Sequence, residues 1–160
     1  MIISNTSPLI HLAKVGKLEL LKDMFGVVHT PLSVYNEVLK QPRNTETVII
    51  KKAVNEGWIK LRKIVLKEPL KKFSTVARAE LETIALAIKE KKTVIIDDKN
   101  AVQIANIFNV KVHGTLYAIL QAVKRRLLKK EEAINIVNQM MENEFYLSSD
   151  VYALFLDLLR

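Results

Sequence analysis

The stretch TVIIDDKNAVQIANIF, residues 93–108, decides the fold of this 160-residue chain. Residues 93–96 form a short β-branched apolar run, which is typical of a strand buried on both faces of a parallel sheet. Asp97 and Asp98 end the run, and apolar residues then recur at helical spacing over residues 101–108. A buried strand followed directly by an amphipathic helix is the repeating unit of an α/β protein.

The same alternation of strand and helix continues on both sides of this stretch. Further strands are expected over residues 1–4, 27–29, 58–64 and 110–112, with the one at 58–64 near an edge of the sheet because its apolar residues alternate with basic ones. The pairs Ser7-Pro8 and Thr30-Pro31 are expected to begin helices, because proline in the first turn loses no hydrogen bond. The sequence therefore predicts one domain, residues 1–160, with a parallel sheet covered by helices on both faces.

Composition narrows the possible partners and chemistry. Twenty-five Lys and Arg residues against 17 Asp and Glu give a net charge of +8, which favours an anionic partner such as nucleic acid. The chain has no cysteine, which excludes disulfides, thiol catalysis and cysteine-ligated zinc. No apolar stretch approaches the ~18 residues of a membrane-spanning helix, and a signal peptide's basic start is missing, so we expect a soluble, cytoplasmic protein without membrane contact.

Polar residues follow two of the predicted strands at the point where ligands bind in open parallel sheets. Asn5, Thr6 and Ser7 come after the first strand, and Asp97 and Asp98 after the later one. Two adjacent acids at one strand end favour a divalent cation, and their hard oxygen atoms suit Mg²⁺ or Mn²⁺. The alternative is that these residues only cap the helices that follow them.

Three glutamates on predicted helices are candidates for the same site. Glu80 and Glu82 flank the apolar stripe of residues 81–88 symmetrically, so spacing alone does not decide which of them faces a cleft. Glu37 lies opposite the apolar side of its own helix, and periodicity places it in solvent.

Several segments, in this order, resemble a PIN domain. They are IISNTSPLIHLAKVGKLELL (2–21), TPLSVYNEVL (30–39), RAELETIALA (78–87), VIIDDKNAVQIA (94–105) and VHGTLYAILQAVKRRLL (112–128). The chain is most similar to a PIN-like subfamily related to the VapC-type toxins of toxin–antitoxin pairs. The resemblance implies a three-layer α/β fold with a central parallel sheet of about four or five strands flanked by helices.

The resemblance also implies a metal-dependent ribonuclease. The first acidic position of the family falls on Asn5, the second on Glu37, and the third on Glu82 with Glu80 as its neighbour. The fourth falls on Asp97-Asp98, with Asp98 the better placed. The catalytic and Mg²⁺- or Mn²⁺-binding residues that it implies are Asn5, Glu37, Glu80, Glu82, Asp97 and Asp98. Ser7, Lys14, Lys71 and Lys72 are the residues expected to contact nucleic acid.

Asn5 departs from the family pattern, which usually has aspartate there. An asparagine carbonyl still ligates a hard cation but removes one negative charge, which lowers metal affinity. The alternative function is therefore a catalytically weak or inactive PIN-like module that binds nucleic acid or protein. RNA, an antitoxin protein and a second copy in a homodimer are the partners that the resemblance implies.

The last predicted helix, residues 150–159, has an apolar stripe. Its members are Val151, Leu154, Phe155 and Leu158. We expect this stripe to pack on the chain's own core in preference to a partner.

Overall fold

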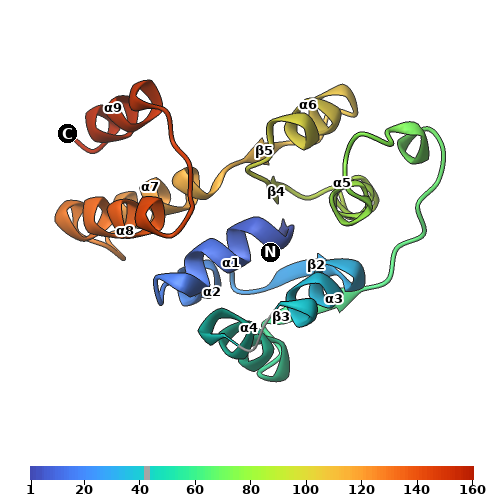
Figure 1. Ribbon diagram of the computed structural model, residues 1–160, viewed down its shortest axis with the longest axis horizontal. Helices are drawn as coiled ribbons and strands as arrows, with labels where there is room; N and C mark the ends of the chain where they lie inside the picture. The colour runs from blue at the N-terminus through green and yellow to red at the C-terminus, as the bar shows by residue number, and fades with distance from the viewer. Residues whose placement is uncertain (42–43) are drawn as a thin grey trace.

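Five parallel strands form the centre of the computed structural model, which describes residues 1–41 and 44–160 (Figure 1). Their order is β3-β2-β1-β4-β5, and each neighbouring pair is parallel. The prediction of a parallel α/β sheet is confirmed, and the strand rich in basic residues, β3, lies at an edge as expected. The strands are β1 (Ile2–Ser4), β2 (Val28–Pro31), β3 (Ile59–Arg62), β4 (Val94–Ile95) and β5 (Val112–His113).

Helices connect the strands and cover the sheet on both faces (Figure 1). A short 3₁₀ helix, η1 (Leu70–Lys72), interrupts the connection from β3 to α5. The α-helices of the described residues are α1 (Thr6–Lys14), α2 (Glu19–Phe25), α3 (Leu32–Lys40), α4 (Thr45–Asn55), α5 (Arg78–Glu90), α6 (Lys99–Ile107), α7 (Thr115–Lys124), α8 (Lys130–Glu142) and α9 (Ser149–Leu158).

The central strand β1 divides the core because successive side chains of a strand point to opposite faces. Ile2 packs in the cluster that contains α1, α2, α7 and α8, and Ile3 packs in the cluster that contains α5 and α6. Strand β4 behaves in the same way, with Ile95 on the side of Ile2 and Val94 on the side of Ile3. This two-sided burial explains why Ile2, Ile3, Val94 and Ile95 are all apolar.

Both proline-containing pairs lie at the start of a helix as predicted, but Thr30 has a role that was not predicted. Pro31 ends β2 and is the N-cap residue of α3, while the Thr30 hydroxyl donates a hydrogen bond to the Ser4 carbonyl oxygen at 2.7 Å. Thr30 is therefore used to join two strands and does not cap a helix. Helix α1 begins at Thr6, so Pro8 lies in its first turn, where a missing N–H is tolerated.

Helix α9 contradicts part of the prediction for the C-terminal stripe. Phe155 is buried in the core as expected. Val151, Leu154 and Leu158 are 40%, 56% and 60% exposed, because the side of α9 that carries them faces away from the core. Among the described residues, no helix is long and apolar enough to cross a membrane.

Candidate active site at the carboxyl ends of the strands

A cavity of about 350 Å³ opens where β1 ends, beside the end of β4. Ser4 pairs with Ile95, so the residues that follow these two strands lie at the same edge of the sheet, as predicted. We call this hollow the strand-end cavity. The residues discussed below that form its wall are Asn5, Thr6, Ser7, His11, Lys14, Glu37 and Glu80.

Asn5 presents an unused hydrogen-bond acceptor at this cavity. Its side chain is 2% exposed, and its backbone N–H donates to the Ile95 carbonyl oxygen at 3.4 Å. It occupies the N-cap position of α1, yet its side chain makes no capping hydrogen bond, and Oδ1 is buried without a hydrogen-bond partner. Since a buried acceptor without a donor is costly, Oδ1 is suited to a cation or another electrophilic ligand.

Glu80 lies in the first turn of α5, close to two other acids. Burial, followed by the negative charges of Asp98 and Glu37, raises the pKa of Glu80 from 4.5 to about 7, against an opposing backbone hydrogen bond from Ala77. Because the charges of Glu37 and Asp98 act on Glu80, these three acids belong to one region at the end of the sheet. The structure therefore brings together acids from three separate segments of the chain.

Glu82 does not take part in this cluster. It lies about 200° around α5 from Glu80, is 5% exposed, and its Oε1 accepts a hydrogen bond from Arg78 Nε at 3.0 Å. Of the two glutamates that the sequence left undecided, Glu80 is part of the cavity wall and Glu82 is not. Asp98 is also not part of that wall, so the lining alone does not exclude Glu82, and the assignment of the third acid stays a prediction.

Glu37 faces the cavity from α3 and accepts a hydrogen bond from the Thr6 hydroxyl at 2.6 Å. This contact joins the acid to the first turn of α1, next to Asn5. Periodicity correctly placed Glu37 away from the apolar side of its helix, and the solvent that it faces is the water of the strand-end cavity.

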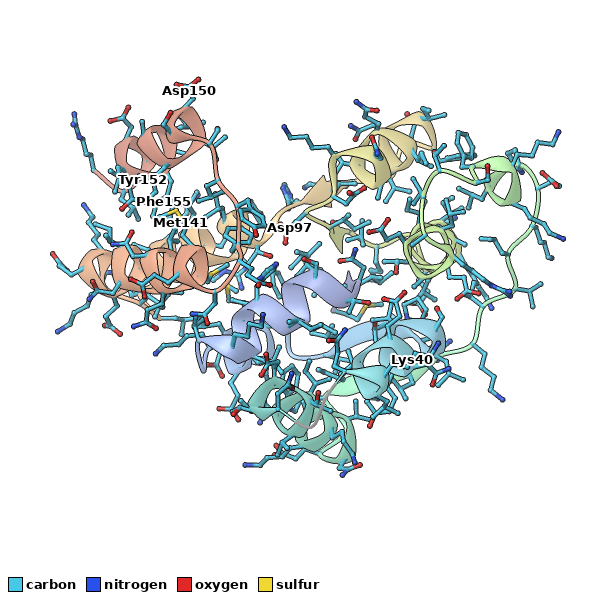
Figure 2. The ribbon with its side chains drawn as sticks, in the orientation of Figure 1. Lys40, Asp97, Met141, Asp150, Tyr152 and Phe155 are labelled. Carbon is cyan, nitrogen blue, oxygen red and sulfur yellow. The ribbon has the colours of Figure 1, made fainter. Side chains whose placement is uncertain are left out.

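The two adjacent aspartates have different roles. Asp97 accepts hydrogen bonds from the Thr115 backbone N–H at 2.8 Å and from its hydroxyl at 2.6 Å, near the connection from β5 to α7 (Figure 2). A Cβ on Gly114 would stand 3.0 Å from Asp97 Oδ1, so glycine permits this close approach. Asp98 caps α6 through one oxygen, which accepts from the Ala101 N–H at 2.9 Å, and its exposed carboxylate keeps a second oxygen. Asp98 can therefore cap α6 with one oxygen and still contribute its other oxygen to the acidic cluster.

Comparisons with known proteins agree with this arrangement. The family model DUF3368, a PIN domain, matches residues 1–160. The chain belongs to the PIN-domain family. Members of this family are generally nucleases and typically use divalent metal ions.

Solved structures share the fold. A PilT N-terminus domain protein from the hyperthermophilic archaeon Sulfolobus solfataricus P2 is similar with a TM-score of 0.58 and 18% identity. The similarity covers 77% of this PIN domain and 94% of the archaeal chain. Among curated protein sequences, none matches this chain.

The basic and hydroxyl residues predicted to contact nucleic acid are divided between two places. Ser7 and Lys14 are part of the wall of the strand-end cavity. Lys71 and Lys72 are exposed on η1 and are not part of that wall.

His11 is a residue of the cavity wall that the sequence analysis did not select. Its ring lies edge-on to Phe145, with 4.9 Å between centroids. Burial lowers the pKa of His11, an effect that the charge of Asp97 opposes. The available signal was its spacing, because Ser7 and His11 are four residues apart and share one face of α1.

The donor atoms of this PIN domain suit a hard cation. Carboxylates of Glu37, Glu80 and Asp98 together with Asn5 Oδ1 are oxygen ligands of the kind that Mg²⁺ and Mn²⁺ take. Within residues 1–41 and 44–160, no three His, Asp or Glu side chains lie close enough to hold an ion as they stand.

Proposed function

We propose that this PIN domain is a metal-dependent ribonuclease that hydrolyses phosphodiester bonds at the strand-end cavity. The observation that supports it best is the position of Glu80 in the strand-end cavity, where burial and the charges of Asp98 and Glu37 raise its pKa, because acids with raised pKa values at the carboxyl end of a parallel sheet are typical of a functional site. The unpartnered Asn5 Oδ1 in the same cavity supports it independently.

In this proposal the acids bind Mg²⁺ or Mn²⁺, and the ion supplies charge neutralisation at the phosphate and an activated water. Glu37, Glu80, Asp98 and Asn5 hold the ion. Asp97 acts through Thr115 by fixing the start of α7, and it does not bind the ion directly. Glu82 holds Arg78 and has no direct role.

The chain's other polar residues orient the RNA strand. Lys14 offers a positive charge and Ser7 a hydroxyl to the phosphates that flank the scissile bond. Thr6 keeps Glu37 pointed into the cavity through its hydroxyl. The overall charge of +8 attracts RNA to the protein despite the acids of the site.

Cleavage of mixed RNA in the presence of Mn²⁺ or Mg²⁺ tests the proposal. Glu80→Gln and Asp98→Asn should each lower the rate about 100-fold or more, as expected when a group acting in the transition state is lost. Glu82→Gln is the matched control on the same helix and should retain most of the activity. Equal losses in Glu80→Gln and Glu82→Gln, or no cleavage by the unaltered protein, would contradict the assignment.

A second candidate function is an inactive PIN module that binds nucleic acid or protein. The neutral Asn5 in the first acidic position favours it, because the site then has one charge fewer for a cation. If the native chain binds RNA without cleaving it and Asn5→Asp gains cleavage, this second function is correct.

We further propose a toxin role with an antitoxin partner, action in the cytoplasm where RNA is available, and assembly as a homodimer.

The exposed side of α9 supports the homodimer, since antiparallel pairing of two α9 helices would bury Val151, Leu154 and Leu158. The same pairing places Asp150 of one copy near Arg160 of the other. Light scattering should give twice the mass of one chain, and Leu154→Glu should halve it; a monomer mass for the native protein contradicts the pairing.

A further inference from the structure

Another hollow lies at the C-terminal half of α5, away from the strand-end cavity. Its volume is about 660 Å³, and it is formed by the connection from β3 to η1, the C-terminal half of α5 and the end of α6. Figure 1 shows this connection running along the outer side of α5. Ile88 in the hollow is eight residues beyond Glu80, which corresponds to about 12 Å along the helix axis.

The floor of this hollow is apolar and open to solvent. Ile64, Val65, Pro69, Ile88 and Phe108 belong to its lining. Val65 is 74% exposed and Ile88 is 41% exposed, which is unusual for two large apolar side chains in one depression. A neighbouring hollow of about 390 Å³ shares Ile88 and Phe108 with the first, so the two adjoin, and we call them together the track.

The rim of the track is strongly basic. Lys63, Lys67 and Lys89 line the first hollow, and Lys91, Lys92 and Lys111 line the second. Glu68 is the one acidic residue in the two linings, so six lysines against one glutamate give a local charge of +5. Among the described residues none of these lysines forms an ion pair, and the nearby Glu90 is occupied by His29 and Arg62.

We propose that this lysine-rimmed groove binds an acidic amphipathic peptide segment of a partner protein. Apolar side chains of the segment would cover Val65 and Ile88, and its Asp and Glu residues would meet the lysines on both sides. The two adjoining hollows, of about 660 Å³ and 390 Å³, suit an amphipathic helix whose apolar face turns toward the floor. Binding here leaves the strand-end cavity open and does not depend on the proposed nuclease function.

The floor of the groove distinguishes a peptide from RNA. Single-stranded RNA needs exposed aromatic faces on which bases stack. Phe108 is the aromatic residue of the floor, and its ring already packs edge-on with Phe73 at 6.0 Å between centroids. Aliphatic side chains such as Ile64, Val65 and Ile88 instead favour contact with apolar peptide side chains, because the contact removes apolar surface from water.

Titration of the ¹⁵N-labelled full chain tests the proposal. The probe is a synthetic peptide of about four helical turns with Leu at i, i+3, i+4 and i+7 spacing and Glu on the flanking positions. Backbone amides of Ile64, Val65, Ile88 and Phe108 should shift on binding. Val65→Glu, which alters a 74% exposed loop residue, should weaken binding about tenfold, while Val48→Glu, at a 64% exposed apolar residue on α4, should leave it unchanged.

Charge reversals complete the design and keep the proposal falsifiable if one variant fails to fold. Lys63→Glu with Lys89→Glu should also weaken binding about tenfold, whereas Lys51→Glu on α4 should not change it. The proposal is overturned if the peptide shifts other amides, or if Lys51→Glu weakens binding equally. It is also overturned if single-stranded RNA displaces the peptide from the same amides, or if α9 of a second copy occupies the groove without peptide.

Discussion

Glu80 has the most unusual environment of the acids at the strand-end cavity, and that environment is created by the fold. Residues far apart in the sequence, Glu37 and Asp98, converge on it from α3 and from the end of β4. Its pKa is about 7 in the folded chain and 4.5 as the ordinary value. Without a cation, and at a pH between these two values, the folded chain therefore keeps a proton on Glu80 that the unfolded chain has released.

This proton makes stability depend on pH. Because the pKa of Glu80 rises from 4.5 to about 7 on folding, the folded chain binds the extra proton between these values, and stability falls as pH rises through that window. Glu80 is half-buried, so solvent screening reduces the effect to about 1–2 kcal/mol. In metal-free urea unfolding, Glu80→Gln should lessen the loss of stability between pH 5 and pH 8 by that amount. Glu19→Gln, at an exposed position on α2, should show the native slope; equal slopes in all three proteins would refute the prediction.

Asn5 sets the charge of the site. Asn5→Asp introduces another carboxylate at a position that is 2% exposed, beside the existing acids. Without metal the new charge should lower the melting temperature by several degrees. With Mn²⁺ it should increase affinity about tenfold, because metal affinity rises with the number of charged ligands. Thermal unfolding and titration calorimetry measure both effects, and Asn36→Asp on the exposed side of α3 is the control. An Asn5→Asp protein that is unchanged with and without Mn²⁺ would show that Asn5 is no part of a metal site.

Sequence reasoning located the strand ends but left open the choice between Glu80 and Glu82. Asn5, Asp97 and Asp98 follow from the rule that ligands meet the carboxyl ends of parallel strands. The choice between Glu80 and Glu82 depends on which helix face turns to the cavity, and that is set by packing of α5 against the sheet and α3. Helical periodicity treats the two flanks as equal, so tertiary contacts were needed to decide.

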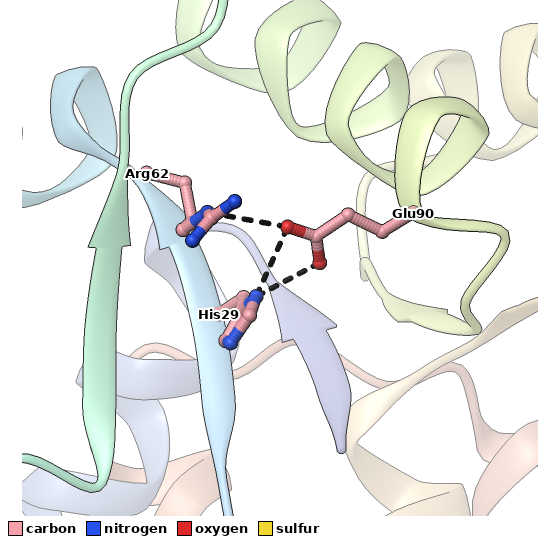
Figure 3. Close-up of polar contacts among 3 residues, drawn as sticks. All are labelled: His29, Arg62 and Glu90. Atoms are coloured by element: carbon pink, nitrogen blue, oxygen red, sulfur yellow. Dashed lines mark hydrogen bonds and ion pairs between the residues drawn. The ribbon is translucent and has the colours of Figure 1, made fainter.

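At the scale of elements, α5 is fastened to the sheet at its C-terminal end. Glu90 accepts a hydrogen bond from His29 on β2, with Nδ1 2.8 Å from Oε2, and forms an ion pair with Arg62 on β3, with Nε 3.3 Å from Oε1 (Figure 3). The side chains of His29 and Glu90 are 15% and 12% exposed. Three elements are thus joined by one carboxylate near the opposite end of α5 from Glu80.

Loss of this carboxylate should weaken the whole domain. Glu90→Gln removes the negative charge of the carboxylate that both His29 and Arg62 contact. We expect this change to lower the free energy of unfolding by about 1–3 kcal/mol. The matched control is Glu56→Gln, which breaks the exposed pair of Lys52 and Glu56 at 3.8 Å and should cost less than about 0.5 kcal/mol. Urea unfolding at neutral pH measures both. Similar losses in the two variants would mean that burial of the Glu90 contacts contributes nothing.

The sequence predicted the elements with strong periodicity and missed contacts that cross between them. The apolar strands β1 and β4 and the striped helices α5 and α7 follow from local pattern. The His29–Glu90 contact joins residues 61 positions apart, and no local pattern connects them. The same limit explains α9, where the stripe was recognised but its orientation was not, since three of its four members face solvent.

At the scale of the whole molecule, charge is separated into regions of different character. Acids gather at the carboxyl ends of the strands, and lysines gather around the groove at the C-terminal half of α5. A net charge of +8 therefore says little about where the proposed RNA substrate would bind. Only basic residues within reach of the strand-end cavity can hold a strand across the proposed reacting atoms.

RNA binding should distinguish among the basic residues accordingly. Lys14 is part of the cavity wall, whereas Lys71 is exposed on η1 and is not. In a Glu80→Gln background that prevents cleavage, Lys14→Glu should weaken binding of single-stranded RNA about tenfold and lower the dependence of affinity on salt by about one phosphate contact. Lys71→Glu is the control with the same change of net charge and should weaken binding much less. Fluorescence anisotropy at several salt concentrations measures both quantities. If the two variants lose affinity equally, long-range attraction by the net charge, not contact at the cavity, holds the RNA.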